Sequence, residues 1–249
     1  MANVQTDSSE KLAEISRELE EQTPQQILQW GVDEFHPHLT LACSFGGPSG
    51  LVLVDMISEI EPQVEVFYLD TDLLFPETYA TRDRVIERYG IQPVAYKSAL
   101  TVDQQAEQHG DELWRRDPDL CCQLRKVEPN QRALAGKHAW IAGIRRDQGA
   151  TRRETPVVAW DEKYGLVKVI PLARWTEADV WAYIAKHDLP YNPLHDKSYP
   201  SIGCTHCTVA VKPGEDPRAG RWPGMDKIEC GINVQDGPIK LARGEEVAR

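Results

Sequence analysis

The chain has 249 residues, 41% of them hydrophobic, which is enough to build the core of one large domain. Its formal net charge is −11. That charge argues against nucleic acid or a lipid surface as a bulk partner, because both require a net basic face. An anionic ligand must therefore be bound at a local basic site.

The six cysteines are scattered along the chain instead of being packed into a short secreted scaffold, which favours a reducing compartment. Charged residues interrupt the N-terminal segment, and no apolar run approaches the roughly 18 residues that a membrane span needs. We therefore expect a cytoplasmic protein without a membrane segment. Nothing in the pattern fixes the oligomeric state, and a homo-oligomer stays possible.

The first predicted elements are two helices, over residues 7–22 and 24–35. Thr23 is suited to cap the second helix, and Pro24 stands at its first position, where the missing N–H costs nothing. We expect them to form an N-terminal helical flank over residues 1–36. A strand over residues 39–45, a glycine-rich loop and a helix over residues 51–60 follow.

The alternation of strands and helices continues along the chain. Further strands are predicted at residues 64–70, 91–97, 138–144 and 166–172, and helices at residues 76–90 and 176–188. This order predicts an α/β domain over residues 37–203, with a parallel sheet flanked by helices. Many prolines and glycines follow residue 189, so we expect residues 204–249 to form an irregular tail that folds over a site.

The loop Ser44-Phe45-Gly46-Gly47-Pro48-Ser49-Gly50 lies between a predicted strand and a predicted helix. Glycines allow backbone N–H groups to approach an anion, and the helix N-terminus adds a favourable dipole. The loop is thus a candidate phosphate cradle, although a tight turn without a ligand explains the glycines equally well. It lacks the lysine of a Walker loop and resembles the glycine-rich loop of the adenine-nucleotide α-hydrolase superfamily.

Two cysteine pairs form a candidate metal centre. Cys121 and Cys122 are adjacent, and Cys204 and Cys207 form a CxxC in a segment rich in proline and glycine. Four soft ligands suit a tetrahedral zinc ion or a [4Fe–4S] cluster, and spacing alone does not separate the two. A redox CxxC and unrelated buried thiols are the alternatives; a redox CxxC usually opens a helix after a strand, so we favour the metal.

Local positive charge accompanies these features. Lys126 lies four residues after Cys122 and would share its face on a helix. Arginines are also concentrated in GIRRDQGATRR (143–153) and RAGRWPG (218–224), and the candidate anion ligands are Arg145, Arg146, Arg218 and Arg221. The planar forks of arginine suit phosphate or sulfate. Each group taken alone is more often a solvated surface.

Cys230 is a candidate nucleophile, because it lies in the predicted tail near cations that would lower its pKa and increase its thiolate fraction. A stray thiol is the alternative explanation. Cys43, on a predicted central strand, is expected to belong to the core.

Several segments together resemble the thiol-dependent sulfonucleotide reductases: YLDTDLLFPETY, DPDLCCQLRKVEP, AWIAGIRRDQ, YNPLHDKSYPSIGCTHC and GRWPGMDKIECGI. The two cysteine pairs are similar to those of the iron–sulfur branch, the assimilatory adenylyl-sulfate reductases. The resemblance runs from about residue 39 to residue 233, which is most of the chain.

This resemblance implies a chemistry for the cysteines. It implies a [4Fe–4S] cluster on Cys121, Cys122, Cys204 and Cys207, linked electrostatically to the substrate by Lys126. It also implies that Cys230 attacks the sulfur of adenosine 5′-phosphosulfate, giving an enzyme S-sulfocysteine and AMP. A thioredoxin- or glutaredoxin-like reductant then releases sulfite.

The resemblance also suggests how substrate is held. Ser44, Gly46, Gly47 and Ser49 would bind the phosphosulfate, and Leu69 and Asp70 would lie near the adenosine. Sulfate repels an incoming thiolate, so a catalyst must supply cations that spread the developing charge. Lys126 and the four candidate arginines are expected to do so.

Two departures from the family pattern leave alternatives open. Residue 233 is asparagine where the family tail usually has histidine, so acid–base chemistry is not available there. The loop also lacks the acidic pair common in iron–sulfur members, which makes 3′-phosphoadenylyl sulfate an alternative substrate. An ATP-dependent adenylating enzyme with a zinc-stabilised site and a nucleotide-binding sensor are the other hypotheses.

Overall fold

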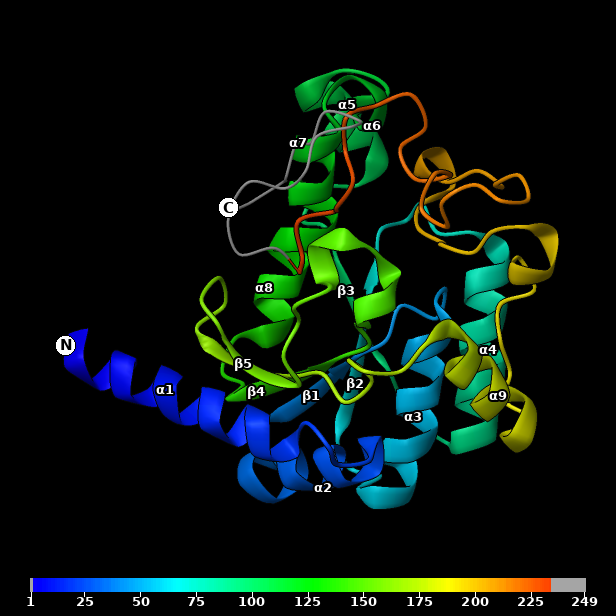
Figure 1. Ribbon diagram of the computed structural model, residues 1–249. Coiled ribbons are helices and arrows are strands. Elements are labelled where there is room, and N and C mark those ends of the chain that lie inside the picture. Colours follow the sequence, from blue (N-terminus) through cyan, green and yellow to red (C-terminus); the bar gives the residue numbers. More distant parts are fainter. Residues whose placement is uncertain (1, 234–249) are drawn as a thin grey trace.

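The computed structural model describes residues 2–233, with side chains from Glu10 onward. The described chain contains a six-stranded sheet in the order β3-β2-β1-β4-β6-β5 (Figure 1). The strands are β1 (Leu39–Ala42), β2 (Glu65–Asp70), β3 (Val94–Lys97), β4 (Ala139–Ala142), β5 (Val158–Asp161) and β6 (Leu166–Val169).

The strands from β3 to β6 pair in parallel, as the alternation of strands and helices predicts. The central strand β1 lies between β2 and β4, with Leu41 opposite Val66 on one side and Ile141 on the other. These residues are buried, because helices cover both faces of the sheet and an apolar residue is stable on either face.

The predicted parallel sheet has one antiparallel strand at its edge. β5 pairs antiparallel with β6, with Val158 opposite Val169 and Asp161 opposite Leu166. Only residues 162–165 connect the two strands, and Gly165 supplies a positive φ of 68° for the turn. Such a short connection can join only antiparallel strands, because a parallel pair needs a crossover of a dozen or more residues.

The predicted helices form at the expected places, as α1 (Ala2–Leu19), α2 (Pro24–Phe35), α3 (Pro48–Ile60), α4 (Pro76–Tyr89) and α9 (Glu177–His187). Thr23 caps α2 through a reciprocal capping box with Gln26, and Gly90 ends α4 in the left-handed conformation. Figure 1 shows α2 and α3 on one face of the sheet and α8 on the other.

A helical segment that was only partly expected connects β3 to β4. It consists of α5 (Val102–His109), α6 (Leu113–Arg116), α7 (Pro118–Cys122), a π-helix (Gln123–Val127) and α8 (Glu128–Leu134). The segment DPDLCCQLRKVEP is therefore helical, but it contains one wider turn. π-turns of this kind are frequent at functional sites.

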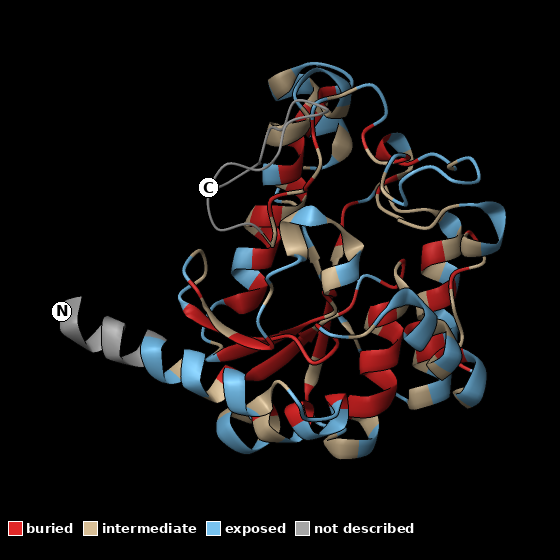
Figure 2. Ribbon diagram, in the orientation of Figure 1, coloured by how far each residue is buried: buried red, intermediate tan, exposed pale blue. Residues whose placement is uncertain are grey.

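The main core contains the central strands and α3, which Figure 2 shows as mostly buried, and it includes Cys43 as predicted. After α9, the described chain has only short 3₁₀ turns, at His195–Lys197 and Thr205–Cys207. This irregular tail folds back over the carboxyl ends of the strands, as expected, with an isolated bridge between Leu74 and Cys204.

The domain boundaries at residues 36/37 and 203/204 stay predictions, and residues 234–249 of the predicted tail lie outside the described residues. Among residues 2–233, no helix combines the length and the apolar character that crossing a bilayer requires.

Candidate active site

A pocket of about 330 Å³ opens at the carboxyl ends of β1, β2 and β4, which is where parallel α/β sheets place their ligands. The tail forms its other wall. Most of the predicted site residues line it: Ser44, Gly46, Gly47, Ser49, Leu69, Lys126, Arg145, Arg218, Arg221 and Cys230.

The glycine-rich loop has the geometry of an anion cradle. Gly47 is the N-cap of α3, Pro48 occupies its first turn, and no side chain caps the helix. The Ser44 hydroxyl accepts a hydrogen bond from the Gly47 N–H at 3.3 Å. The His195 ring nitrogen lies 2.9 Å from the Gly46 carbonyl oxygen, so the loop is fixed from the tail side. Uncapped N–H groups at this helix end are available to an anion.

Three of the four predicted arginines face this loop or the opposite wall. Arg145 Nη1 donates to the Ser49 hydroxyl at 2.6 Å, and its Nε donates to Asp147 at 2.9 Å. Arg221 lies so close over Gly203 that a Cβ there would come within 2.4 Å of its Nη2. The structure thus gathers Arg145, Arg218 and Arg221 around one pocket.

Arg146 and Asp70 lie away from the pocket. Arg146 binds the Glu20 carboxylate at 2.5 and 3.0 Å, and Asp70 accepts a hydrogen bond from the Tyr79 hydroxyl at 2.7 Å. The reason is the extended backbone, in which successive side chains point to opposite faces. Leu69 and Arg145 point into the pocket, so the residue that follows each of them points out.

The two cysteine pairs come together beside the pocket. Cys122, Cys204 and Cys207 form a buried cluster with Trp222. Burial raises the pKa of Cys121 to about 11, with further increases from the neighbouring Cys122 and Cys204 thiols. The same causes keep the pKa of Cys207 at about 11. Four buried thiols in mutual electrostatic contact are unfavourable as thiolates unless a positive group joins them.

Polar groups around the thiols fit an anionic metal–sulfur group. Thr71 Oγ1 lies 3.3 Å from Cys204 Sγ. Arg125 is buried next to Cys121, and neither its Nε and Nη2 nor Trp222 Nε1 has a hydrogen-bond partner within the part of the chain that the structure describes. Buried donors of this kind are ordinarily satisfied, so they suit acceptors on a cluster held by the thiols.

Within residues 2–233, no group of three or more His, Cys, Asp or Glu side chains is arranged to hold a single metal ion.

Cys230 comes from the tail and lines the pocket together with Lys126. Burial would raise the pKa of the Cys230 thiol, but the positive charge of Lys126, assisted by Arg221, brings that pKa below its ordinary value of 9.0. Burial would lower the pKa of Lys126, but the thiols of Cys204, Cys122 and Cys230 raise it above its ordinary value. A lysine charge is thus shared between the buried thiols and the pocket thiol.

Comparison with known proteins agrees with this geometry. The phosphoadenosine phosphosulfate reductase domain model matches residues 38–210. The chain belongs to this reductase family. It is 46% identical to the adenosine 5′-phosphosulfate reductase of Salinibacter ruber, over 91% of this chain and 90% of the relative. It is 49% identical to adenosine 5′-phosphosulfate reductase 1 of Bacillus subtilis, over 83% of this chain and 89% of that protein.

Solved structures share the fold of this reductase family. The phosphoadenylyl-sulfate reductase of Candida auris, solved as a phosphate complex, superposes with a TM-score of 0.72 and 38% identity, over 80% of this chain and 97% of that one. The FMN adenylyltransferase of Candida glabrata superposes with a TM-score of 0.55 at 14% identity, over 78% of this chain and 65% of that one. The second likeness shows the fold alone.

Four side chains that hold the tail of this reductase were not found from the sequence. Arg152 and Glu229 form an ion pair at 3.0 Å. Lys163 Nζ donates to the Gly231 carbonyl oxygen at 2.5 Å, and Lys168 Nζ donates to Asn233 Oδ1 at 2.9 Å. The arginine-rich segment and the acid beside Cys230 were visible signals for the first pair. The two lysines carried no signal, because β5 and its turn into β6 were not predicted, although Lys168 lies within the strand predicted at residues 166–172.

Proposed function

We propose that this reductase converts adenosine 5′-phosphosulfate to sulfite and AMP, as the names of its relatives indicate for them. One observation carries the proposal. Cys230, from a tail remote in sequence, lies in the same pocket as the glycine-rich loop, Lys126 and the arginines. A thiol with a lowered pKa is thereby brought to an anion site.

Binding uses the loop and the strand ends. The N–H groups of the loop at the start of α3, together with Arg145, hold the phosphosulfate, and Leu69 packs near the adenosine. The Cys230 thiolate attacks the sulfur atom. A bond forms between Sγ and that sulfur, the bond from sulfur to the bridging oxygen breaks, and AMP leaves with its electron pair.

Cations and a closed tail promote this transfer. Lys126, Arg218 and Arg221 line the pocket from two sides and spread the charge that develops on the sulfate oxygens. The tail covers the site during the attack and keeps water from the sulfur.

Sulfite is released in a second displacement. A thiolate of a thioredoxin- or glutaredoxin-like dithiol attacks Cys230 Sγ, and the bond between Sγ and the sulfonate sulfur breaks. Sulfite leaves with the electron pair, and the second thiol of the reductant restores Cys230 while a disulfide forms. The dithiol thus supplies both electrons. Because Cys230 is partly buried, the tail has to move for the reductant to reach it.

Cys121, Cys122, Cys204 and Cys207 are the residues that would hold a [4Fe–4S] cluster in this enzyme. When bound, such a cluster supplies a fixed charge beside the site, against which the Lys126 ammonium is held. The chain's own contribution is the shell of donors around the thiols, including Arg125 and the Thr71 hydroxyl.

3′-Phosphoadenylyl sulfate is the second candidate substrate. Residues 44–50 contain no carboxylate that would repel a 3′-phosphate. The relative from Candida auris is named a phosphoadenylyl-sulfate reductase. Substrates with and without the 3′-phosphate therefore have to be compared directly.

Anaerobic turnover with reduced thioredoxin tests both substrates. We expect sulfite and AMP from adenosine 5′-phosphosulfate with the wild-type enzyme. With Cys230→Ser we expect a loss of at least a thousandfold in kcat, because the hydroxyl cannot replace the thiolate nucleophile. Iron content and brown colour, unchanged in the variant, are the control for the cysteine centre. A fully active serine variant would disprove the proposal, and the ratio of kcat/KM decides between the substrates.

A further inference from the structure

Glu229 precedes the proposed nucleophile and is almost fully buried, with 4% of the residue exposed. Its carboxylate binds the Arg152 guanidinium with two contacts, from Oε1 to Nε at 3.1 Å and from Oε2 to Nη2 at 3.0 Å. Arg218 Nη2 lies 3.2 Å from the same Oε2, and the Thr151 hydroxyl donates to Oε1 at 3.3 Å. One buried acid is thus held from three sides.

The two arginines belong to the wall of the pocket, whereas Glu229 does not line it. Arg152 lies in the short helix Ala150–Arg152 that follows β4, and Arg218 lies in the tail. Arg218 Nη2 also donates to the carbonyl oxygen of Ile228 at 2.6 Å. The Glu229 carboxylate therefore ties the backbone next to Cys230 to the fixed, sheet-bound side of the pocket.

The charges of Glu229 and the two arginines indicate that Glu229 holds the tail in place and does not bind the substrate. Burial would raise the pKa of Glu229, but Arg152 and Arg218 bring it below its ordinary value, so the acid is ionised at neutral pH. Burial lowers the pKa of Arg218 to about 10, so this arginine stays protonated at neutral pH. One carboxylate between two guanidinium groups leaves one positive charge for an anion in the pocket.

We propose that Glu229 is a positioning residue that docks the segment carrying Cys230 onto Arg152, with Arg218 of the tail bracing the contact, and thereby sets Cys230 for attack on the substrate sulfur. The inference rests on the proposed function, in which Cys230 is the nucleophile. It assigns Glu229 to the transfer step and not to binding, because its carboxylate faces the arginines and would repel an anionic substrate.

The inference predicts a loss in kcat without a rise in KM. Glu229→Gln keeps the shape and removes the charge, so the tail docks less often and kcat falls at least tenfold. The KM for adenosine 5′-phosphosulfate stays the same or falls, because both arginines lose a competing carboxylate. Loss of a residue that binds substrate would instead raise KM.

The test measures the first step alone. Wild-type enzyme and variants are mixed with adenosine 5′-phosphosulfate without reductant, and the rate at which the Cys230 sulfonate adduct forms is followed by mass spectrometry. The alkylation rate of Cys230 by iodoacetamide, without substrate, is divided by the thiolate fraction taken from its pH profile, because the Glu229 charge also raises the pKa of Cys230. The corrected rate reports how often the tail is undocked. We expect slower adduct formation and faster alkylation in Glu229→Gln, with partial rescue by Glu229→Asp.

Asp226→Asn is the matched control, because it removes the same charge from the same tail at an exposed position. It should leave both rates unchanged. Thr151→Val removes one hydrogen bond to Glu229 and should shift both rates in the same direction by a smaller factor, which keeps the test valid if Glu229→Gln does not fold.

The outcomes separate the two proposals. If the wild-type enzyme forms no adduct, the proposed function fails, while faster alkylation in Glu229→Gln would still support docking. If the wild type forms the adduct and Glu229→Gln has wild-type kcat and alkylation rates, the inference is overturned. A raised KM at unchanged kcat would overturn it as well, because Glu229 would then act in binding.

Discussion

Asn233 shows what a single residue of the tail contributes. Its Oδ1 accepts a hydrogen bond from Lys168 Nζ, which also lies 3.5 Å from the Asp161 carboxylate and 4.5 Å from the centre of the Trp140 ring. This contact requires only an acceptor, and an amide is an acceptor at every pH. Asn233 can therefore fix the tail without any acid–base role.

Lys168 should make stability depend on pH. Burial lowers its pKa from 10.5 to about 8, against a partial increase from Asp161. Between these two values the unfolded chain binds more protons than the folded chain, so this lysine makes the fold more stable as the pH rises. One pKa unit corresponds to about 1.36 kcal/mol. The free energy of unfolding should therefore gain about 3 kcal/mol from Lys168 as the pH rises through the interval between the two pKa values.

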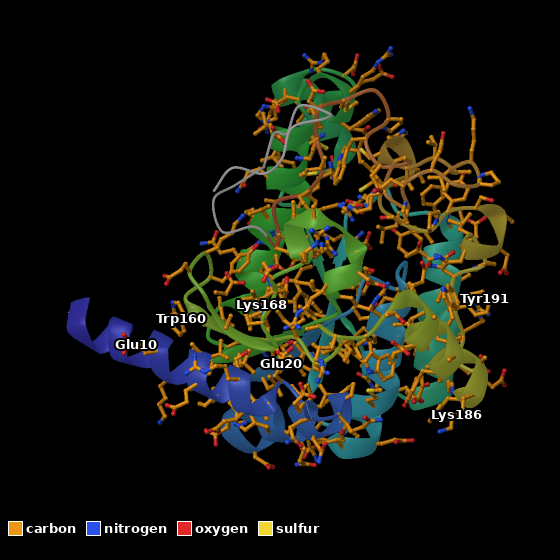
Figure 3. The ribbon with its side chains drawn as sticks, in the orientation of Figure 1. Glu10, Glu20, Trp160, Lys168, Lys186 and Tyr191 are labelled. Carbon is orange, nitrogen blue, oxygen red and sulfur yellow. The ribbon has the colours of Figure 1, made fainter. Side chains whose placement is uncertain are left out.

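Urea unfolding of the wild type and Lys168→Met measures this contribution. The difference between their free energies of unfolding should rise in favour of the wild type from pH 8 to pH 10.5, the interval between the two pKa values. Lys186→Met, at an exposed position of α9 labelled in Figure 3, is the matched control. A constant difference for Lys168→Met would contradict the prediction.

Single candidate residues could be selected from the sequence where the residue type itself is rare. The cysteine pairs and Cys230 were found because thiols have few roles in a reducing compartment, and the structure brings them to one place. Side-chain direction could not be predicted. Arg145 and Arg146 are chemically identical, and only the strand geometry places the first in the pocket and the second against Glu20.

At the scale of elements, sequence patterns missed β5, whereas its partner β6 lies within the strand predicted at residues 166–172. β5 has only four residues, VAWD, and a strand this short shows no clear alternation. The hairpin that β5 forms with β6 is nonetheless placed to hold the tail, because its Lys163 and Lys168 donate hydrogen bonds to Gly231 and Asn233. Lys168 is labelled in Figure 3. Longer elements such as α3 and α4 were predicted because their caps and apolar periodicity extend over several turns.

The hairpin should hold the tail from the side opposite to Glu229. Lys163→Met keeps the aliphatic stem and removes the donor to the Gly231 carbonyl oxygen, which lies one residue from Cys230. A hydrogen bond from a charged group contributes about 1.5–3 kcal/mol. We therefore expect a roughly tenfold lower kcat with unchanged KM and faster alkylation of Cys230. Lys186→Met is again the matched control, and unchanged alkylation of Lys163→Met would exclude a docking role.

At the scale of the whole molecule, the N-terminal flank is fastened to the sheet through the segment that also carries Arg145. Helix α1 packs along β5, and the Ser16 hydroxyl accepts a hydrogen bond from the Val158 N–H at 3.3 Å (Figure 1). Glu20, which is labelled in Figure 3 just after α1, binds Arg146. Of the two consecutive arginines, Arg145 thus lines the pocket, and Arg146 attaches the N-terminal flank.

This arrangement predicts that Arg146 acts on stability and not on substrate binding. Glu20→Gln and Arg146→Gln each remove a partly exposed pair, in which both side chains are 30% exposed, so each should lower the free energy of unfolding by about 1 kcal/mol. The double variant should lose little more than either single variant, because both changes remove one shared interaction. The KM for adenosine 5′-phosphosulfate should stay at the wild-type value in all three. If Arg146→Gln raised KM while Glu20→Gln did not, Arg146 would bind substrate, as its place in the arginine-rich segment suggested.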